Sequence, residues 1–231
     1  MSAKPRIGIY GLTSCAGDQL TLLNCEDELL AILDAVDLRS FVMAHSANPE
    51  GELDVAFVEG AVTQQSDLDL LTDVRSRAGL VIAIGTCAVW GGLPYLAGKG
   101  TAISQHIQVD FSIPGCPIEK SQLLNALSAL LHGDLPLELP YPVCLECTIR
   151  ENNCLLQRGE ICCGSLTAGG CGARCPSHGV ACMGCRGSAL DPNYQSAQQI
   201  LAKYGYTPED ILQRLALFSG EGFSKEGERV G

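Results

Sequence analysis

The sequence predicts an α/β protein with an open parallel sheet, followed by a separate cysteine-rich module. Two observations predict this arrangement in a chain of 231 residues. Strand-like and helix-like segments alternate over residues 1–140, which is typical of a parallel sheet with helices on both faces. Nine of the thirteen cysteines then fall between Cys144 and Cys185, in a segment with few large apolar residues that needs cross-links to fold. We therefore expect a sheet domain at 1–140, a cysteine module at 141–190 and a helical tail at 191–231.

Short apolar segments predict the strands of the first domain, at residues 6–12, 39–44, 54–58, 80–84 and 111–113. The segment 80–84 carries no charge, as expected of an interior parallel strand that is covered on both faces. Residues 78–98 are uncharged as a whole and could be mistaken for a membrane span, but they are interrupted by Gly79, Gly85, Gly91, Gly92 and Pro94. We therefore expect a buried strand and a loop there, and no membrane span.

Apolar residues at helical spacing predict helices at 19–33, 67–77 and 118–132, the last with Pro117 near its start. Residues 135–142 contain three prolines and predict a linker. In the tail, a helix is expected at 196–203. A second should follow Thr207 and Pro208, which fit the N-cap and first helical position. The apolar face of that second helix, at Ile211, Leu212, Leu215 and Phe218, must pack against another part of the protein.

Composition limits the choice of partners and of cellular compartment. The net charge is −11, and residues 1–140 hold 7 basic against 17 acidic side chains. This acidity argues against nucleic acid as a partner. The first residues lead directly into an apolar strand without a signal-peptide pattern, so we expect a cytoplasmic protein with reduced thiols. Because thirteen cysteines are also an odd number, metal binding is favoured over a disulfide framework.

Three of the remaining cysteines follow predicted strands of the sheet. Cys15 comes after the first strand, Cys87 after the strand at 80–84, and Cys116 after the last. Because ligands of parallel sheets bind at the carboxyl ends of the strands, these three loops should converge. Each cysteine also lies near a glycine or proline that permits a tight turn. Three thiolates are one ligand short of the four that usually hold a [4Fe–4S] cluster.

Asp18 is the candidate for the fourth ligand. It lies three residues after Cys15, where a Cys-x2-Cys pair would place its second thiolate. A carboxylate would alter the reduction potential of such a cluster. The alternative is that Asp18 caps the helix expected to begin there. Cys25 is a competing ligand on the same helix face, but it lies two turns away and is expected to be a buried core residue.

The cysteine module allows either zinc or iron–sulfur clusters. Cys144 and Cys147, together with Cys182 and Cys185, could form a four-thiolate zinc ribbon. That arrangement would leave five cysteines of the module unexplained. Eight cysteines instead fill two [4Fe–4S] sites, and these are Cys144, Cys147, Cys154, Cys162, Cys171, Cys175, Cys182 and Cys185. Cys163 is then the spare residue, although Cys162 is the alternative spare and the pairing of the eight stays open.

Four motifs in order resemble the small subunit of nickel–iron hydrogenases. They are Gly11-Leu12-Thr13-Ser14-Cys15, Val58-Glu59-Gly60-Ala61, Gly85-Thr86-Cys87-Ala88 and Pro114-Gly115-Cys116-Pro117. The block Cys171-Gly172-Ala173-Arg174-Cys175-Pro176, with Cys182-Met183-Gly184-Cys185-Arg186-Gly187, resembles the cytosolic multimeric branch of that family more specifically. This branch includes sulfhydrogenase delta subunits and related methanogen enzymes. The resemblance covers residues 6–190.

The resemblance implies a flavodoxin-like domain that carries a proximal [4Fe–4S] cluster on Cys15, Asp18, Cys87 and Cys116. The eight module cysteines would hold medial and distal clusters, which makes three [4Fe–4S] clusters in all. H2 oxidation or proton reduction would take place at a nickel–iron centre on a separate large subunit, so no catalytic residue is expected on this chain. Glu59 matches a family glutamate that is expected to assist proton movement, although it could equally cap a neighbouring helix.

The same resemblance implies that electrons are relayed between the large subunit and a flavin- and NAD(P)-type reductase subunit, with a further ferredoxin-like subunit as an additional partner. Two other functions remain alternatives. One is an iron–sulfur subunit of a quinone-reductase complex, although such subunits lack the cysteine module. The other is a zinc-stabilised interaction module, which would be colourless because Zn²⁺ has no redox chemistry.

Overall fold

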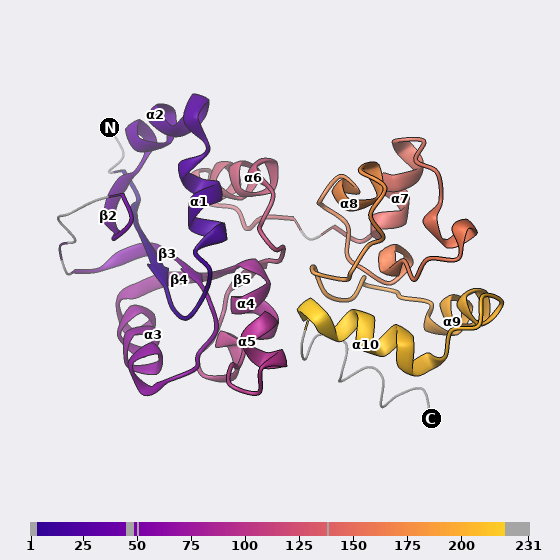
Figure 1. Ribbon diagram of the computed structural model, residues 1–231. Coiled ribbons are helices and arrows are strands. Elements are labelled where there is room, and N and C mark those ends of the chain that lie inside the picture. The colour runs from indigo at the N-terminus through magenta and orange to yellow at the C-terminus, as the bar shows by residue number, and fades with distance from the viewer. Residues whose placement is uncertain (1–3, 45–48, 50, 138, 220–231) are drawn as a thin grey trace. The chain divides into compact units, whose positions relative to one another are not determined.

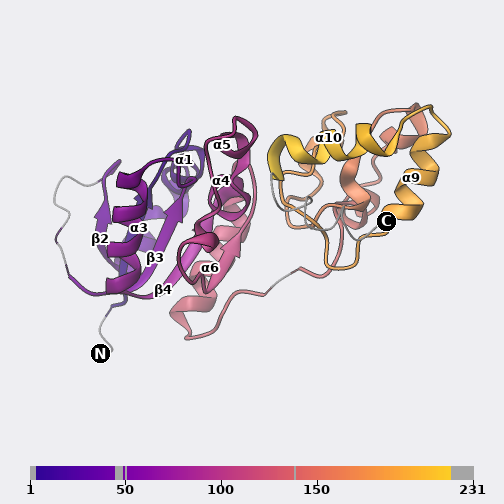
Figure 2. The same cartoon turned by 90° about the horizontal axis from the view of Figure 1, so that it is seen from below.

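The computed structural model describes residues 4–44, 49, 51–137 and 139–219. The chain divides into two compact units, Met1–Leu137 and Glu138–Gly231 (Figures 1 and 2). The boundary lies inside the proline-containing segment 135–142. We refer to these parts below as the first unit and the second unit.

The first unit is built on a five-stranded parallel sheet with the order β2-β1-β3-β4-β5. The strands are β1 (Arg6–Gly11), β2 (Asp37–Phe41), β3 (Leu53–Glu59), β4 (Ala78–Ile84) and β5 (Phe111–Ile113). This order is the flavodoxin-like one, so the expected fold is confirmed. The strand register pairs Gly11 with Glu59, Glu59 with Ile84, and Ile84 with Ile113. Four strands therefore end at one level, at the carboxyl edge of the sheet.

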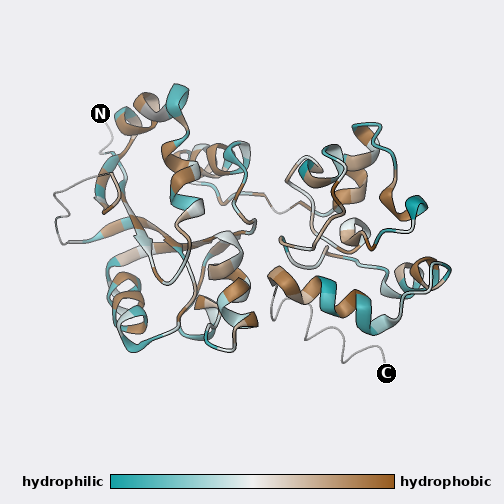
Figure 3. Cartoon of the chain, in the orientation of Figure 1, coloured by the Kyte–Doolittle hydropathy of each residue, from teal (hydrophilic) through white to brown (hydrophobic). Residues whose placement is uncertain are grey.

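Alternate residues of each strand supply the two cores of the first unit. Along β3, Val55 and Phe57 join one apolar cluster, while Ala56 and Val58 join the other, because successive side chains point to opposite faces of a sheet. Figure 3 shows the apolar character of these strands against the more polar α3 (Gln65–Arg77). Burial on both faces explains why β3 and β4 read as nearly continuous apolar segments.

The prediction of a single helix at 19–33 is wrong. Two helices take its place, α1 (Gly17–Leu23) and α2 (Glu26–Ala35), with a break at Asn24 and Cys25. Three consecutive acidic residues open α2, and negative side chains favour a helix N-terminus over a helix interior. Cys25 is fully buried in the apolar core at this break, in agreement with its expected role as a core residue.

The prediction of a loop after β4 is also wrong, because short helices follow this strand. They are α4 (Gly85–Trp90) and α5 (Gly92–Leu96), joined by Gly91 at φ +84°. Glycine commonly ends a helix in this left-handed conformation. A 3-10 turn follows at Ile103–Gln105, and α6 (Lys120–Leu131) begins three residues beyond Pro117. Helices as short as α4 show too few turns for their periodicity to be read from the sequence.

The second unit contains short helices and two longer ones. They are α7 (Val143–Ile149), 3-10 turns at Leu155–Arg158 and Cys163–Ser165, α8 (Arg174–Ser177), α9 (Tyr194–Ala202) and α10 (Pro208–Ser219). The two tail helices predicted from the sequence are therefore present. They pack on the cysteine-bearing segment, where one apolar cluster joins Cys163 and Leu166 to Ala197, Leu201, Ile211 and Leu215. Leu212, which the sequence predicts on the same buried face, is 41% exposed.

Thr207 and Asp210 begin α10 with a reciprocal cap. The Asp210 carboxylate accepts the Thr207 N–H at 2.7 Å, and the Thr207 hydroxyl accepts the Asp210 N–H at 3.2 Å. This pair satisfies two backbone groups that a helix N-terminus otherwise leaves unbonded. Among all helices in the described residues, none is long and apolar enough to cross a membrane.

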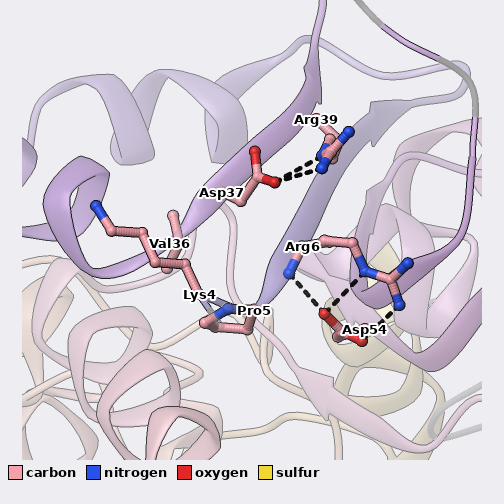
Figure 4. A pocket seen from close by; sticks show the side chains of 7 residues that line it. All are labelled: Lys4, Pro5, Arg6, Val36, Asp37, Arg39 and Asp54. Atoms are coloured by element: carbon pink, nitrogen blue, oxygen red, sulfur yellow. Dashed lines mark hydrogen bonds and ion pairs between the residues drawn. The ribbon is translucent and has the colours of Figure 1, made fainter. Parts of the chain in front are cut away.

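A surface pocket lies at the amino ends of β1, β2 and β3 and is lined by charged side chains (Figure 4). The Arg6 guanidinium bonds to Asp54 through Nε at 3.2 Å and Nη2 at 3.0 Å, and Arg39 pairs with Asp37 at 2.6 Å. The carboxylates of Asp37 and Asp54 are thus paired with arginines inside this pocket, while Lys4, which also lines it, pairs with Asp34 at 3.2 Å. It lies at the sheet edge opposite the carboxyl edge that carries the cysteines.

Candidate metal centres

Cys15, Cys87 and Cys116 are brought together at the carboxyl edge of the sheet. Cys15 follows β1, Cys87 lies in the first turn of α4 directly after β4, and Cys116 follows β5. Although Cys116 is exposed, the pKa of its thiol is raised to about 11, mainly by desolvation and in addition by the charges of Cys87, Asp18, Cys15 and Glu59. Burial, together with the charges of Asp18, Cys15 and Glu59, also raises the pKa of the Cys87 thiol to about 11. The charges of Cys15 and Asp18 thus act on both Cys87 and Cys116, so the three loops lie within electrostatic range of one another.

Glycines allow the chain to approach these thiols closely. Gly92 has φ +54°, and a Cβ at this position would lie 2.8 Å from the Cys87 Sγ. The backbone N–H of Leu93 also bonds to the Cys87 sulfur and offsets part of the effect of burial on its pKa. Cys15 and Gly17 make a comparable approach, because a Cβ on Gly17 would lie 3.3 Å from the Cys15 Sγ. Backbone N–H groups near sulfur suit an anionic thiolate cluster.

Asp18 is buried beside these thiols and does not cap its helix. The N-cap of α1 is Ala16, with no side-chain cap. The Asp18 Oδ1 instead accepts the backbone N–H of Ile118 at 2.8 Å, so its carboxylate reaches the segment that carries Cys116. The pKa of Asp18 is raised to about 7, because burial and the Glu59 charge outweigh the opposing effect of the bond from the Ile118 N–H. Of the two roles weighed from the sequence, the helix cap is thus excluded by the geometry.

Glu59, at the end of β3, is fully buried. Its two carboxylate oxygens accept the backbone N–H groups of Asp18 at 3.4 Å and Gln19 at 3.1 Å. These N–H groups belong to the first turn of α1, which has no intrahelical partner for them. Glu59 therefore caps α1 from the neighbouring strand and fixes the position of Asp18.

Gly85 packs directly against the Asp18 carboxylate, which leads to a testable expectation. Gly85 has φ +82°, and a Cβ there would overlap the Asp18 Oδ2. We expect Gly85→Ala to displace the carboxylate, to break the Ile118 bond and to reduce the iron bound by the first unit. Gly98→Ala is the matched control, because Gly98 has φ +70° and nothing within 4 Å. That control should cost only the strain of a left-handed alanine, about 1 kcal/mol. Iron content and urea unfolding of both variants measure the difference, and equal iron in the two would contradict the expectation.

In the second unit, one group of thiols forms the first cysteine set. It consists of Cys144, Cys147, Cys154 and Cys162. The pKa of Cys144 is raised to about 12, mainly by burial and in addition by the charges of Cys162, Cys147 and Cys154. Cys162 is affected by Cys154 and Cys147 in the same way. A Cβ on Gly164 would lie 3.4 Å from the Cys144 Sγ and 3.8 Å from the Cys162 Sγ, so this glycine lies between the two thiols.

We call the other four module cysteines, Cys171, Cys175, Cys182 and Cys185, the second cysteine set. Cys182 is 6% exposed, and burial raises its pKa well above the usual value. Among the charges that raise it further are those of Cys162 and Cys185. The Cys182 N–H also donates to the Cys162 Sγ at 3.3 Å. The two sets therefore touch at Cys162 and Cys182.

One local geometry recurs in both sets. At three cysteines the sulfur accepts the backbone N–H of the second residue after it: Gly164 for Cys162, Ala173 for Cys171 and Gly184 for Cys182. Burial raises the pKa of all three thiols, and these N–H groups offset part of that effect. Hydrogen bonds to sulfur are among the factors that set iron–sulfur potentials. The donor chemistry of the second unit therefore fits iron–sulfur clusters.

Cys163 is a core residue of the second unit. It is 1% exposed and belongs to the apolar cluster that α9 and α10 cover. Burial raises the pKa of its thiol to about 12, as expected of a thiol in apolar surroundings. The thiol of its neighbour Cys162 interacts with the first set instead. The two adjacent cysteines therefore lie in different surroundings.

All thirteen cysteines lie among the described residues, and none of them forms a disulfide. In the described residues no three Cys, His, Asp or Glu side chains are arranged around a point suited to a single metal ion.

The sequence did not reveal two charged residues of the second unit. Arg186 is 3% exposed, and its Nε donates to the carbonyls of Ala168 at 3.1 Å and Gly169 at 2.8 Å. Glu146 accepts the backbone N–H groups of Gly170 and Ala173. Both residues hold the segment that leads into Cys171. The sequence signal that could have pointed to these two residues is that each lies directly beside a cysteine of a Cys-x2-Cys pair.

Comparison with known proteins agrees with this geometry. Residues 15–130 match the family described as NADH ubiquinone oxidoreductase, 20 kDa subunit. The sequence is 37% identical to the sulfhydrogenase 2 subunit delta of Pyrococcus furiosus, over 93% of this chain and 99% of the relative. It is 31% identical to a vhu subunit of the F420-non-reducing hydrogenase of Methanocaldococcus jannaschii, over 93% of both chains. The fold is similar to that in an actinobacterial-type NiFe-hydrogenase structure from Ralstonia eutropha H16, with a TM-score of 0.67 at 16% identity, covering 99% of this chain and 90% of that one.

Proposed function

Since this chain belongs to the family of the NADH ubiquinone oxidoreductase 20 kDa subunit and is the small subunit of a nickel–iron hydrogenase, we propose that it transfers electrons between a large-subunit nickel–iron site and a flavin-containing reductase. The observation that carries the proposal is the convergence of three thiols and one buried carboxylate at the carboxyl edge of the sheet. H2 oxidation or proton reduction takes place on the large subunit, and the residues of this chain serve electron transfer.

We assign three [4Fe–4S] clusters to the chain. The proximal one is held by Cys15, Asp18, Cys87 and Cys116. The first and second cysteine sets hold the medial and distal ones. When bound, such clusters supply one-electron chemistry at potentials set by ligand type, hydrogen bonds to sulfur and solvent exposure. Pairing by chain order is supported by the mutual electrostatic effects within the first set, and Cys163 is the spare residue.

The surroundings of Cys87 support contact with the large subunit. Leu93 and Leu96 of α5, which follows the helix of Cys87, are each 50% exposed. Exposed apolar side chains that gather beside a site are typical of protein interfaces. The loops around Cys15, Cys87 and Trp90 are the proposed interface. Glu59, a buried carboxylate at the same edge, is the proposed proton-path residue.

Further partners are proposed from the resemblance and from the names of the relatives. Both relatives are named as subunits of hydrogenases, which supports a hetero-oligomer with a large subunit. A flavin- and NAD(P)-type reductase and a ferredoxin-like subunit complete the proposed complex. We place this complex in the cytoplasm, where thiols stay reduced.

Metal analysis of the complex, purified without oxygen, tests the proposal. Three cubane clusters require about twelve iron and twelve acid-labile sulfide per small subunit, with H2-dependent reduction of a dye. One or two zinc without sulfide would support the zinc-stabilised interaction module instead. Iron and sulfide without any H2-dependent activity would contradict the hydrogenase assignment.

The Asp18 series tests the unusual ligand. We expect Asp18→Ala to lose about four iron, because the fourth ligand and the Ile118 contact disappear together. Asp18→Cys should keep full iron but lower the potential of the proximal cluster, since a thiolate donates more charge to iron than a carboxylate does. Iron analysis and a redox titration followed by EPR provide the measurements. Full iron and unchanged potentials in both variants would show that Asp18 is not a ligand.

A further inference from the structure

Glu146 lies between Cys144 and Cys147 on α7, but its carboxylate faces the segment that carries the second cysteine set. Its Oε1 accepts the N–H of Gly170 at 2.7 Å, and its Oε2 accepts the N–H of Ala173 at 3.2 Å. The Cys171 Sγ lies 3.9 Å from the same Oε2. One partly buried carboxylate thus holds the turn around Cys171 onto the helix that carries the first set.

Two neighbouring side chains extend this contact along the same face. The Asn152 amide donates to the Cys147 Sγ at 3.6 Å and to the Ser177 hydroxyl at 2.9 Å. Arg150 packs on the other side, since a Cβ on Gly172 would lie 2.8 Å from its Nη2. The segment from Glu146 to Asn152 therefore meets the segment from Gly170 to Ser177 at three points. Each segment carries cysteines of a different set.

The carboxylate also adds negative charge beside a sulfur ligand. Burial raises the pKa of the Cys171 thiol, the Glu146 charge raises it further, and the N–H of Arg174 and the charge of Arg186 oppose both effects. A negative group near a redox centre disfavours the addition of an electron, because the extra charge is repelled in a medium of low dielectric constant. Glu146 would therefore destabilise the reduced state of a cluster held by Cys171.

We propose that Glu146 is a positioning residue that joins the two cysteine sets and lowers the reduction potential of the cluster that Cys171 helps to bind. This inference rests on the proposed function, because it requires clusters on both sets. Substitutions can separate the two roles proposed for Glu146, which are to hold the Cys171 turn in place and to put a negative charge beside the Cys171 sulfur. Glutamine keeps the size and one acceptor oxygen but removes the charge, whereas alanine removes the charge and both acceptors.

The first experiment is an EPR-monitored redox titration of the anaerobically purified complex carrying Glu146→Gln. We expect one of the three midpoint potentials to rise while the other two stay unchanged. Glu209→Gln is the matched control, because it removes the same charge from an exposed position in the first turn of α10 and should move no potential. A contact with a merely structural role would lower the unfolding temperature without moving a potential.

The second experiment is iron and sulfide analysis of Glu146→Ala, with far-UV circular dichroism to confirm that the helices are retained. We expect the loss of about four iron or more, because the Cys171 turn is released from α7. Full iron in Glu146→Ala and unchanged potentials in Glu146→Gln would overturn the inference while leaving the proposed function intact. A wild-type complex without iron and sulfide would contradict both.

Discussion

Replacing Cys87 with alanine should remove one cluster from the complex, with the loss of about four iron and four sulfide per chain, and should reduce H2-dependent dye reduction to background. Cys15 acts on the pKa of Cys87, and Cys87 acts on the pKa of Cys116. The Cys87 sulfur accepts the Leu93 N–H and is closely approached by Gly92. In the described part of the first unit, Cys25 is the remaining thiol, and it is buried in the core. No thiol is therefore placed to replace Cys87. Iron analysis and a hydrogenase assay of the same preparation measure the two effects.

Cys25→Ala is the control for this variant. It removes a thiol from the same unit, at a position with no exposed surface. We expect full iron content and a loss of stability of about 1 kcal/mol, the scale of a small cavity in a core. Loss of iron in Cys25→Ala together with full iron in Cys87→Ala would reverse the assignment of ligand and core residue.

The adjacent cysteines of the second unit should behave in opposite ways. We expect Cys162→Ser to lose about four iron, because its sulfur faces Cys144 and accepts the Cys182 N–H at 3.3 Å. Cys163→Ala should keep all iron, because its side chain packs against Leu201 and Leu215 instead. Its expected cost is about 1 kcal/mol of stability from the cavity left under α9 and α10.

Iron analysis and denaturant unfolding of this pair decide which cysteine is the spare. Full iron in Cys162→Ser and a deficit in Cys163→Ala would make Cys163 the ligand. The pairing of the eight module cysteines would then have to change. Equal deficits in both variants would indicate a general loss of fold, which the far-UV spectrum would reveal.

Much of the fold could be predicted from the sequence because its signals are local. The strands of a buried parallel sheet read as apolar segments, and β3 and β4 appear close to their predicted ranges. The convergence of Cys15, Cys87 and Cys116 also followed from a general rule, since strands of a parallel sheet share one carboxyl edge. The break between α1 and α2 and the short α4 could not be predicted in the same way. The end of α4 depends on the left-handed conformation of Gly91, and the break between α1 and α2 places Cys25 in the core.

The roles of the two carboxylates depend on partners far along the chain. From its sequence context, Asp18 could be either a helix cap or a cluster ligand. Its carboxylate bonds to the N–H of Ile118, 100 residues away, which excludes the helix cap. Glu146 has the sequence context of an ordinary acidic residue inside a Cys-x2-Cys pair. Its partners are backbone N–H groups 24 and 27 residues later. The sequence marks the position of Glu146 beside Cys147, but it cannot show which backbone N–H groups the carboxylate bonds to, because every residue type except proline offers that donor.

The ion-paired pocket at the amino edge of the sheet has a practical consequence for electrochemistry. Its lining residues, among them Lys4 and Asp37, lie at the end of the strands that is remote from Cys15, Cys87 and Cys116. The Lys4 side chain is 51% exposed, so an amine-reactive linker can reach it. With the other lysines replaced by arginine, tethering the protein to an electrode or a bead through Lys4 would leave the cysteine edge of the first unit facing the solution, open to its large subunit.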